Sequence, residues 1–259
     1  MDTAGTGGGR PTFNVSTTAA FIAAGAGCKV AKHGNRSATS QCGSADVLEA
    51  LGARIDLEPD AVAACIEEVG FGFMFAPNHH SAMRHVVPVR KALGVRTIFN
   101  LLGPLTNPAG ARRQVIGVSD PSKLETLASA LAALGTESAL VVSSADGLDE
   151  FSVSGDTRVV ELKDGDLTTY DVSPEDVGIE VRGNGAVAGG TPDQNARVLR
   201  DVLEGKDGDE RELATLNAAA AVYVGGMAES LSAGVQRARA AIDEGAAVRV
   251  LDAYLERTR

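Results

Sequence analysis

The stretch that begins at Lys32 has the side chains of an anion-binding loop. From Lys32 to Ser40 it carries two cations, an imidazole, an amide and several hydroxyls, and it runs through Gly43 and Ser44 into an apolar-periodic segment at 45–51. Glycines let a backbone come close to a ligand, and the N–H groups that open a helix attract anions. This composition predicts a polyanion site, with an ordinary polar loop before a helix as the alternative.

An earlier loop, from Gly5 to Thr17 and called the first loop below, is rich in glycines and hydroxyl side chains. Such a loop can form a nest of backbone N–H groups that binds phosphate. It does not match the dinucleotide fingerprint GxGxxG, and it lacks the lysine of a P-loop. A phosphate loop is therefore the favoured interpretation, and a structural turn is the alternative.

Asp149 and Glu150 are adjacent carboxylates that follow a predicted strand at 139–143 and a Gly-Leu turn. In open α/β sheets, binding sites lie at the carboxyl ends of the strands. Two carboxylates there suit Mg²⁺ bridged to a substrate phosphate. In an acidic chain a surface charge pair is the alternative, but the two phosphate-type loops favour the metal.

Three of the four histidines lie at 79, 80 and 85. His80 and His85 are five residues apart with no carboxylate between them, which is a poor match for metal ligands on one helix face. Arg90, in a helix predicted over 81–93, is more informative because a guanidinium fork binds a carboxylate at two points. A surface salt bridge is the alternative for Arg90.

Composition narrows the class of protein. The chain has 259 residues, is 44% hydrophobic and carries a net charge of −10, which argues against non-specific binding to nucleic acid or anionic membranes. Its three cysteines have no CxxC spacing, so neither a zinc site nor a disulfide framework is expected. We see no signal peptide and no membrane span, and we expect a cytoplasmic protein.

Strand and helix patterns alternate along the chain, which predicts an α/β fold with a mostly parallel central sheet flanked by helices. At most four residues are available for a strand before the loop at Gly5. Further strands are predicted at 28–31, which would deliver Lys32 at its end, and at 114–118 and 139–143, with two β segments within 157–172. Helices are predicted at 18–26, 44–51, 60–69, 81–93, 121–134, 192–204, 209–225, 229–245 and 247–257.

Together these segments resemble the anthranilate phosphoribosyltransferases of tryptophan biosynthesis. The resemblance covers nearly the whole chain. It rests on GTGG at 5–8, TFNVST at 12–17, AKHGNRSATSQCGSADVLEALG at 31–52, GFGFMFAPNHHSAMRHVVPVRKALGVRTIFNLLGPLTNPAG at 70–110, GLDE at 147–150 and GGTPDQNA at 189–196.

The resemblance implies transfer of the phosphoribosyl group of 5-phosphoribosyl 1-diphosphate to the amine of anthranilate, with Mg²⁺ and in a homodimer. It places the diphosphate substrate among Gly5, Gly8, Gly9, Thr12, Asn14, Val15, Ser16, Thr17, Lys32, His33, Gly34, Asn35, Arg36, Ser37, Ala38, Thr39, Ser40 and Ser44. It places anthranilate against Gly5, His33, Asn35, His80 and Arg90, and Mg²⁺ on Ser16, Asp149 and Glu150. We name no catalytic acid or base, because the aryl amine of anthranilate is already neutral at pH 7.

The chain departs from the family pattern in two places. The first loop is one residue shorter than GTGGD plus three residues before the threonine, and Gly9 stands where the family has aspartate. The family also carries several helices before the glycine loop. We therefore expect residues 1–259 to form the α/β domain of nucleoside phosphorylase/phosphoribosyltransferase type. Residues at about 76–94 would be a remnant of the small helical domain, in an N-terminally truncated chain.

Three other functions compete with this interpretation. A pyrimidine nucleoside phosphorylase would share the fold and a Lys-His loop, but LLGPLTNP and GLDE favour the transferase. A nucleic-acid-binding relative would need a basic groove, against which the net charge of −10 argues. An inactive fragment of the enzyme is the third alternative.

Overall fold

The computed structural model describes residues 1–37, 40–80, 97–183 and 187–259. Its larger sheet has the strand order β1-β4-β5-β6-β7. The strands are β1 (Asp2–Gly5), β4 (Arg113–Gly117), β5 (Ser138–Ser144), β6 (Thr157–Lys163) and β7 (Asp166–Val172). A second sheet pairs β2 (Val30–Gly34) with β3 (Phe71–Phe75).

The pairings β1–β4, β4–β5 and β2–β3 are parallel, and β5–β6 and β6–β7 are antiparallel. The expected mostly parallel α/β sheet is therefore confirmed. In the register of β1, β4 and β5, Gly5 lies opposite Gly117, and Gly117 lies opposite Val142. The carboxyl ends of these three strands consequently meet at one edge of the sheet, where binding sites form in such folds.

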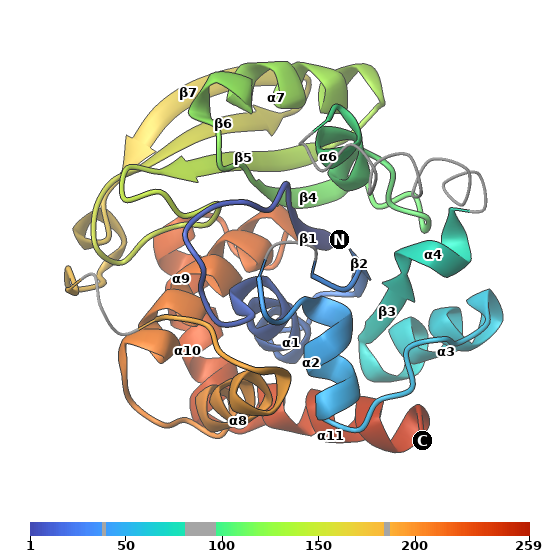
Figure 1. The fold of residues 1–259 in the computed structure, drawn as a ribbon. Helices are drawn as coiled ribbons and strands as arrows, with labels where there is room; N and C mark the ends of the chain where they lie inside the picture. Colours follow the sequence, from blue (N-terminus) through green and yellow to red (C-terminus); the bar gives the residue numbers. More distant parts are fainter. Residues whose placement is uncertain (38–39, 81–96, 184–186) are drawn as a thin grey trace.

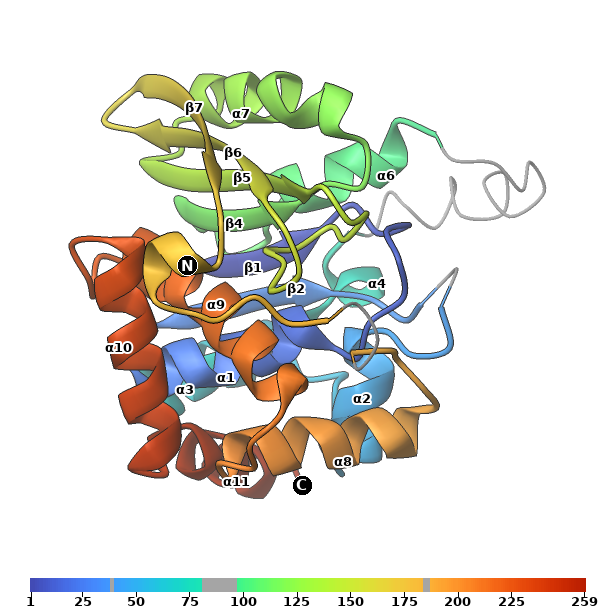
Figure 2. The same ribbon diagram turned by 90° about the vertical axis from the view of Figure 1, so that its left-hand side faces the viewer.

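Helices cover both faces of the larger sheet (Figures 1 and 2). Helix α7 (Leu124–Ala133) packs on β5 and β6, while α1 (Val15–Gly25) and α9 (Asp209–Val224) pack on the opposite face. Outside α1 and α9 lie α8 (Pro192–Leu203), α10 (Leu231–Asp243) and α11 (Ala246–Arg257). The central strands are therefore buried on both sides, which explains their continuous apolar runs.

The core has two parts, one on each side of the sheet. Ile116 and Val141 belong to the cluster that includes the inner side of α7. Val115, Leu140 and Val142 belong to the larger cluster with α1 and α9. This alternation follows from the period of two in a strand.

Four further helices and three 3-10 turns complete the described elements. They are α2 (Ser44–Ala50), α3 (Pro59–Val69), the short α4 (Ala76–His79) and α6 (Phe99–Leu102), and 3-10 turns at Gly103–Leu105, Pro121–Lys123 and Glu175–Val177. The predicted helix at 81–93, and with it most of the expected helical remnant at 76–94, lies outside the described residues. In the described parts of the chain, no helix has the length and apolar character needed to cross a membrane.

Two details of the sequence prediction were wrong. The strand at 28–31 is displaced to Val30–Gly34, so that Lys32 lies inside β2 rather than at its end. The strand at Phe71–Phe75 was not predicted, because the periodicity of a short apolar run does not distinguish a buried strand from a buried helix segment. Its pairing with β2 and burial between α3 and the core make it a strand.

Candidate active site

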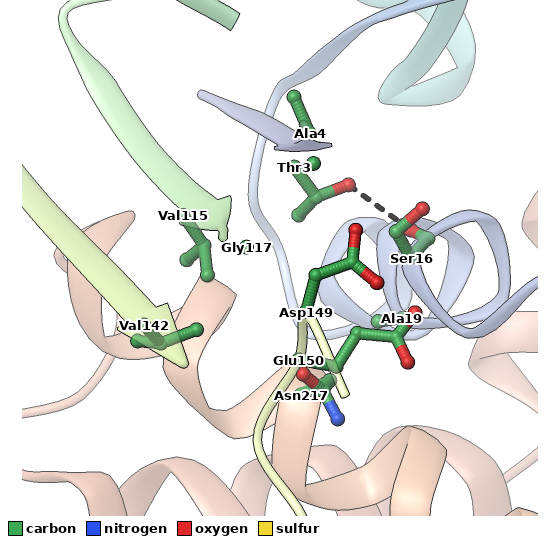
Figure 3. Close-up of a pocket in the computed structure, with 11 residues that line it drawn as sticks. Thr3, Ala4, Ser16, Ala19, Val115, Gly117, Val142, Asp149, Glu150 and Asn217 are labelled. Atoms are coloured by element: carbon green, nitrogen blue, oxygen red, sulfur yellow. Dashed lines mark hydrogen bonds between the residues drawn. The ribbon is translucent and has the colours of Figure 1, made fainter. Parts of the chain in front are cut away.

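A cavity of about 70 Å³ lies where β1, β4 and β5 end (Figure 3). The acidic pair Asp149 and Glu150 lines it from the loop after β5, and Ser16 lines it from the first turn of α1. In Figure 3 both carboxylates extend toward α1. The full lining is Thr3, Ala4, Gly5, Ser16, Ala19, Val115, Gly117, Val142, Asp149, Glu150 and Asn217.

Asp149 packs against glycine residues of the first loop and of β4. The Gly7 N–H donates to Asp149 Oδ2 at 3.1 Å. A Cβ atom at Gly117 would overlap the Asp149 carbonyl oxygen, and one at Gly5 would lie 2.9 Å from Asp149 Oδ2. Because Gly5 in β1 and Gly117 in β4 have no side chains, the acidic segment can reach the strand ends.

The same packing explains how this chain accommodates Gly9 in its shorter loop. A Cβ atom at Gly9 would lie 2.6 Å from Asp149 Oδ1 and 2.8 Å from the Asp149 nitrogen. The neighbouring Arg10 donates from its backbone N–H to the Gly147 oxygen at 2.8 Å, and its guanidinium lies 3.4 Å from Asp146. The first loop and the acidic segment therefore pack closely, and a side chain at position 9 would require one of them to shift.

Glu150 is held in an environment that disfavours its charge. Burial raises the pKa of Glu150 well above its ordinary value, and the neighbouring Asp149 charge raises it further. The Thr12 hydroxyl, which donates to Glu150 Oε2 at 3.2 Å, and the Lys32 ammonium oppose this shift. A cation bound between the two carboxylates would remove the repulsion between them.

Lys32 is buried, with 1% of its surface exposed. Its Nζ donates to the Thr3 carbonyl oxygen at 2.6 Å, to Thr3 Oγ1 at 3.2 Å and to Ser16 Oγ at 3.3 Å. Burial lowers the pKa of Lys32 to about 8, while Asp2 and Glu150 act in the opposite direction. The ammonium thus ties β2 to β1 and to the first turn of α1.

The loop after β2 is folded against α2. The Arg36 guanidinium pairs with Glu49 and with Asp46, the latter at 3.0 Å. Asp46 also accepts the backbone N–H groups of Ser37 at 3.1 Å and of Gly43 at 2.8 Å. Asp46, in the first turn of α2, consequently holds the loop through Arg36, Ser37 and Gly43.

A hydrogen bond joins the first loop to the loop after β2 close to the cavity. Thr17 Oγ1 donates to Ser44 Oγ at 3.1 Å, which joins the first turn of α1 to the start of α2. Ser37 and Ser40 share a hydrogen bond between their hydroxyls at 2.6 Å. Ala38 and Thr39 lie outside the described residues.

His33 and His80 come together although 47 residues separate them. Their Nε2 atoms lie 3.1 Å apart, and their rings meet edge to face with centroids 4.9 Å apart. Burial, followed by the neighbouring His80 and His79, lowers the pKa of His33 to about 4. His33 is therefore neutral at pH 7. Arg90, the other predicted contact for anthranilate, lies outside the described residues.

Comparison with known proteins shows which family the chain resembles. A sequence model described as "Glycosyl transferase family, a/b domain" matches residues 1–248. The anthranilate phosphoribosyltransferase of Rubrobacter xylanophilus is 54% identical over 261 residues, covering 100% of this chain and 76% of that protein. This chain belongs to the anthranilate phosphoribosyltransferase family. The enzyme of that name from Symbiobacterium thermophilum is 54% identical over 259 residues, with the same coverage.

Solved structures of the anthranilate phosphoribosyltransferase family have the same fold. The enzyme from Thermus thermophilus superimposes with a TM-score of 0.93 and 46% identity, covering 100% of this chain and 77% of that one. The enzyme from Saccharomyces cerevisiae in complex with PRPP and Mg gives a TM-score of 0.91 and 32% identity, covering 99% and 73%. The chain thus spans about three quarters of the length of these relatives.

Within this anthranilate phosphoribosyltransferase fold, Asn217 is a site residue that the sequence analysis missed. Its Oδ1 accepts the Phe151 N–H at 3.0 Å, and its Nδ2 donates to the oxygens of Phe151 at 3.0 Å and Leu213 at 2.9 Å. Asn217 therefore holds the backbone directly after Glu150. The signal in the sequence was an amide at the start of the alanine-rich run 217–224, which we interpreted only as a helix.

Asp2 and Asn107 were also missed. The buried Asp2 accepts the His33 N–H at 3.2 Å with Oδ1 and the Asn107 amide at 2.7 Å with Oδ2. Asn107 donates to the Ala31 oxygen at 2.9 Å as well. This pair fixes β2 at His33, next to the last residue of the strand. LLGPLTNP at 101–108 carried the family resemblance, but nothing in its pattern pointed to this contact.

The donors around the acidic pair fit a magnesium ion. In the chain outside 38–39, 81–96 and 184–186, no group of three or more His, Cys, Asp or Glu side chains is placed to hold a metal. Two carboxylates and the Ser16 hydroxyl leave coordination positions for substrate phosphate and water, as Mg²⁺ prefers. Burial first and the Asp149 charge second raise the pKa of Glu150, and a bound cation would offset both effects.

Proposed function

We propose that this chain transfers the 5-phosphoribosyl group of 5-phospho-α-D-ribose 1-diphosphate to the amine of anthranilate. The products are N-(5-phosphoribosyl)anthranilate and diphosphate, in tryptophan biosynthesis. The observation that carries the proposal is the meeting of the glycine loop, Ser16 and the pair Asp149–Glu150 around one cavity at the strand ends. The chain's membership of the family supports the same reaction.

Departure of diphosphate leaves a ribosyl centre with positive character and places negative charge on the leaving group. Catalysis therefore depends on stabilising that charge and on positioning the two substrates. We assign the diphosphate to the N–H groups and hydroxyls of the first loop and of the loop after β2. Bound Mg²⁺ would neutralise part of the diphosphate charge, held by Ser16, Asp149 and Glu150.

The buried ammonium of Lys32 supports the same end of the site. Its Nζ bonds to Ser16 Oγ, so it orients a hydroxyl that we assign to Mg²⁺. It also lowers the pKa of Glu150 and so favours the charged form of this carboxylate. Lys32 thus acts on the substrate site through Ser16 and Glu150, from within β2.

We assign anthranilate to the end of the site formed by Gly5, His33, Asn35, His80 and Arg90. The aryl amine is neutral at pH 7 and needs no strong base, which agrees with the neutral state of His33. The family resemblance gives Arg90 the anthranilate carboxylate.

We further propose that the enzyme works in the cytoplasm and forms a homodimer, as the family resemblance implies. Its three cysteines are free and buried, which is consistent with a reducing compartment. We expect small-molecule substrates only, because a net charge of −10 disfavours nucleic acid and anionic membranes.

The test is a fluorescence assay of anthranilate consumption with phosphoribosyl diphosphate and Mg²⁺. We expect turnover that stops when Mg²⁺ is chelated and falls strongly in the double variant Asp149→Asn/Glu150→Gln. Running an N-terminally extended chain beside this one separates a wrong function from a need for further sequence. Phosphorolysis of thymidine by both chains, without anthranilate turnover, would replace the proposal with a nucleoside phosphorylase.

A further inference from the structure

The segment at 187–195 packs against the first loop at Thr12 and Phe13. The Val187 oxygen accepts the Phe13 N–H at 3.1 Å. A Cβ atom at Gly189 would overlap the Thr12 carbonyl oxygen, so the two backbones are in direct contact. This segment carries most of GGTPDQNA, a family motif for which neither the substrates nor the metal account.

Asn195 connects this segment to the loop by its side chain. It lies in the first turns of α8 and is 2% exposed. Its Oδ1 accepts the Gly190 N–H at 2.8 Å, and its Nδ2 donates to Asn14 Oδ1 at 2.9 Å. The Asn195 amide therefore acts as an acceptor toward Gly190 and as a donor toward Asn14.

Asn14 belongs to the first loop and connects it to the loop after β2. Its Nδ2 donates to the Cys42 oxygen at 3.3 Å, in the loop after β2. Its backbone oxygen accepts the N–H groups of Thr17 and Thr18, which opens α1. Ser16 lies in that first turn, two residues after Asn14.

We propose that Asn195 is a positioning residue for the diphosphate site, acting through Asn14. The proposal rests on the proposed function. Asn195 fixes the direction of the Asn14 amide, and Asn14 in turn holds the first loop and the loop after β2 at the separation that the diphosphate requires. Gly189 contributes at Thr12, whose hydroxyl reaches Glu150.

The variant Asn195→Asp tests this directly. Aspartate keeps the shape and the acceptor for Gly190, but it places an oxygen against Asn14 Oδ1 instead of an N–H donor. Asn195→Ala removes both contacts. The matched control is Val202→Ala, which removes buried side-chain volume near the opposite end of the same helix.

We expect the Asn195 variants to lose roughly 10- to 100-fold in kcat/KM for phosphoribosyl diphosphate, with KM for anthranilate little changed. Calorimetric titration of Mg²⁺-phosphoribosyl diphosphate without anthranilate should show the same loss of affinity. Val202→Ala should bind like the parent chain at temperatures where both are folded. Equal kinetics for Asn195→Asp and Val202→Ala would overturn the positioning role and leave the proposed function standing.

A double-mutant cycle with Asn14→Ala separates positioning from a general structural effect. If Asn195 acts through Asn14, Asn195→Ala should cause little further loss of phosphoribosyl diphosphate affinity in the Asn14→Ala background. Independent, additive losses would contradict the proposal. A parent chain that neither binds nor turns over phosphoribosyl diphosphate would overturn the proposed function and the positioning role together.

Discussion

The Thr12 hydroxyl donates a hydrogen bond to Glu150 Oε2 at 3.2 Å, across 138 residues of sequence. The contact joins the glycine loop after β1 to the acidic segment after β5. Gly7, which donates to Asp149 at 3.1 Å, makes a second link between the same segments. The proposed phosphate loop and the proposed magnesium ligands are therefore one structural unit.

The variant Thr12→Val should weaken Mg²⁺ binding in a pH-dependent manner. The Thr12 hydroxyl bond lowers the pKa of Glu150, so its loss should raise that pKa and favour the protonated form of Glu150. The deficit in Mg²⁺ affinity should shrink as the pH rises and Glu150 ionises. Calorimetric titrations between pH 6 and 9 measure it, with Thr168→Val on the exposed strand β7 as control. A deficit independent of pH would contradict this account.

Gly117→Ala should displace the acidic pair. The added Cβ would overlap the Asp149 carbonyl oxygen, so the loop after β5 must move away from β4. We expect a loss of about 1–3 kcal/mol in the free energy of unfolding together with loss of Mg²⁺-dependent activity. Urea unfolding and the anthranilate assay measure the two effects. Gly155→Ala, where a Cβ meets nothing within 4 Å, should change neither.

Asn217→Ala should leave the backbone around Phe151 without partners. The Phe151 N–H and oxygen both lose a buried hydrogen bond, which costs about 1–3 kcal/mol for each unsatisfied group. Because Glu150 directly precedes this residue, the KM for Mg²⁺ should rise as well. Thr215→Val on the same helix is the control, since the Thr215 hydroxyl has no hydrogen-bond partner among the described residues. Unchanged Mg²⁺ dependence in Asn217→Ala would refute the link to Glu150.

His33 predicts how stability depends on pH in mild acid. The unfolded chain binds a proton at this histidine near pH 6.5, whereas the folded chain does so only near pH 4. Between these values the unfolded state binds more protons, so the free energy of unfolding should decrease as the pH falls. The contribution is about 2–3 kcal/mol across this range.

Urea unfolding at several pH values from 4 to 7 measures this slope. The variant His33→Gln, which cannot titrate, should have a shallower dependence over the same range. Identical slopes in the two chains would mean that another group controls the acid sensitivity. Burial, followed by the neighbouring His80 and His79, is the cause that we assign to the low pKa of His33.

Much of the fold could be predicted from local pattern. The predicted strand at 139–143 and the helix at 209–225 are confirmed as β5 (Ser138–Ser144) and α9 (Asp209–Val224). Both have long apolar runs bounded by turn residues, which local rules detect. Phe71–Phe75 was not detected by these rules, because so short an apolar run is ambiguous and its pairing with β2 decides that it is a strand.

The sequence by itself determined the chemical groups of the site: a glycine loop at 5–9, a cationic loop from Lys32, and the carboxylates Asp149 and Glu150. Their types and their positions after strands indicated phosphate and magnesium, and their motifs indicated the family. These are local properties, which residue order alone specifies.

Only the tertiary structure decided which of these groups are in contact and how their pKa values are shifted. It turned Lys32 inward onto Ser16, paired Arg36 with the carboxylates of α2, and placed Asn195 behind Asn14. Contacts between residues far apart in the chain depend on strand register and helix packing. The pKa of a group depends on burial, and local sequence specifies neither.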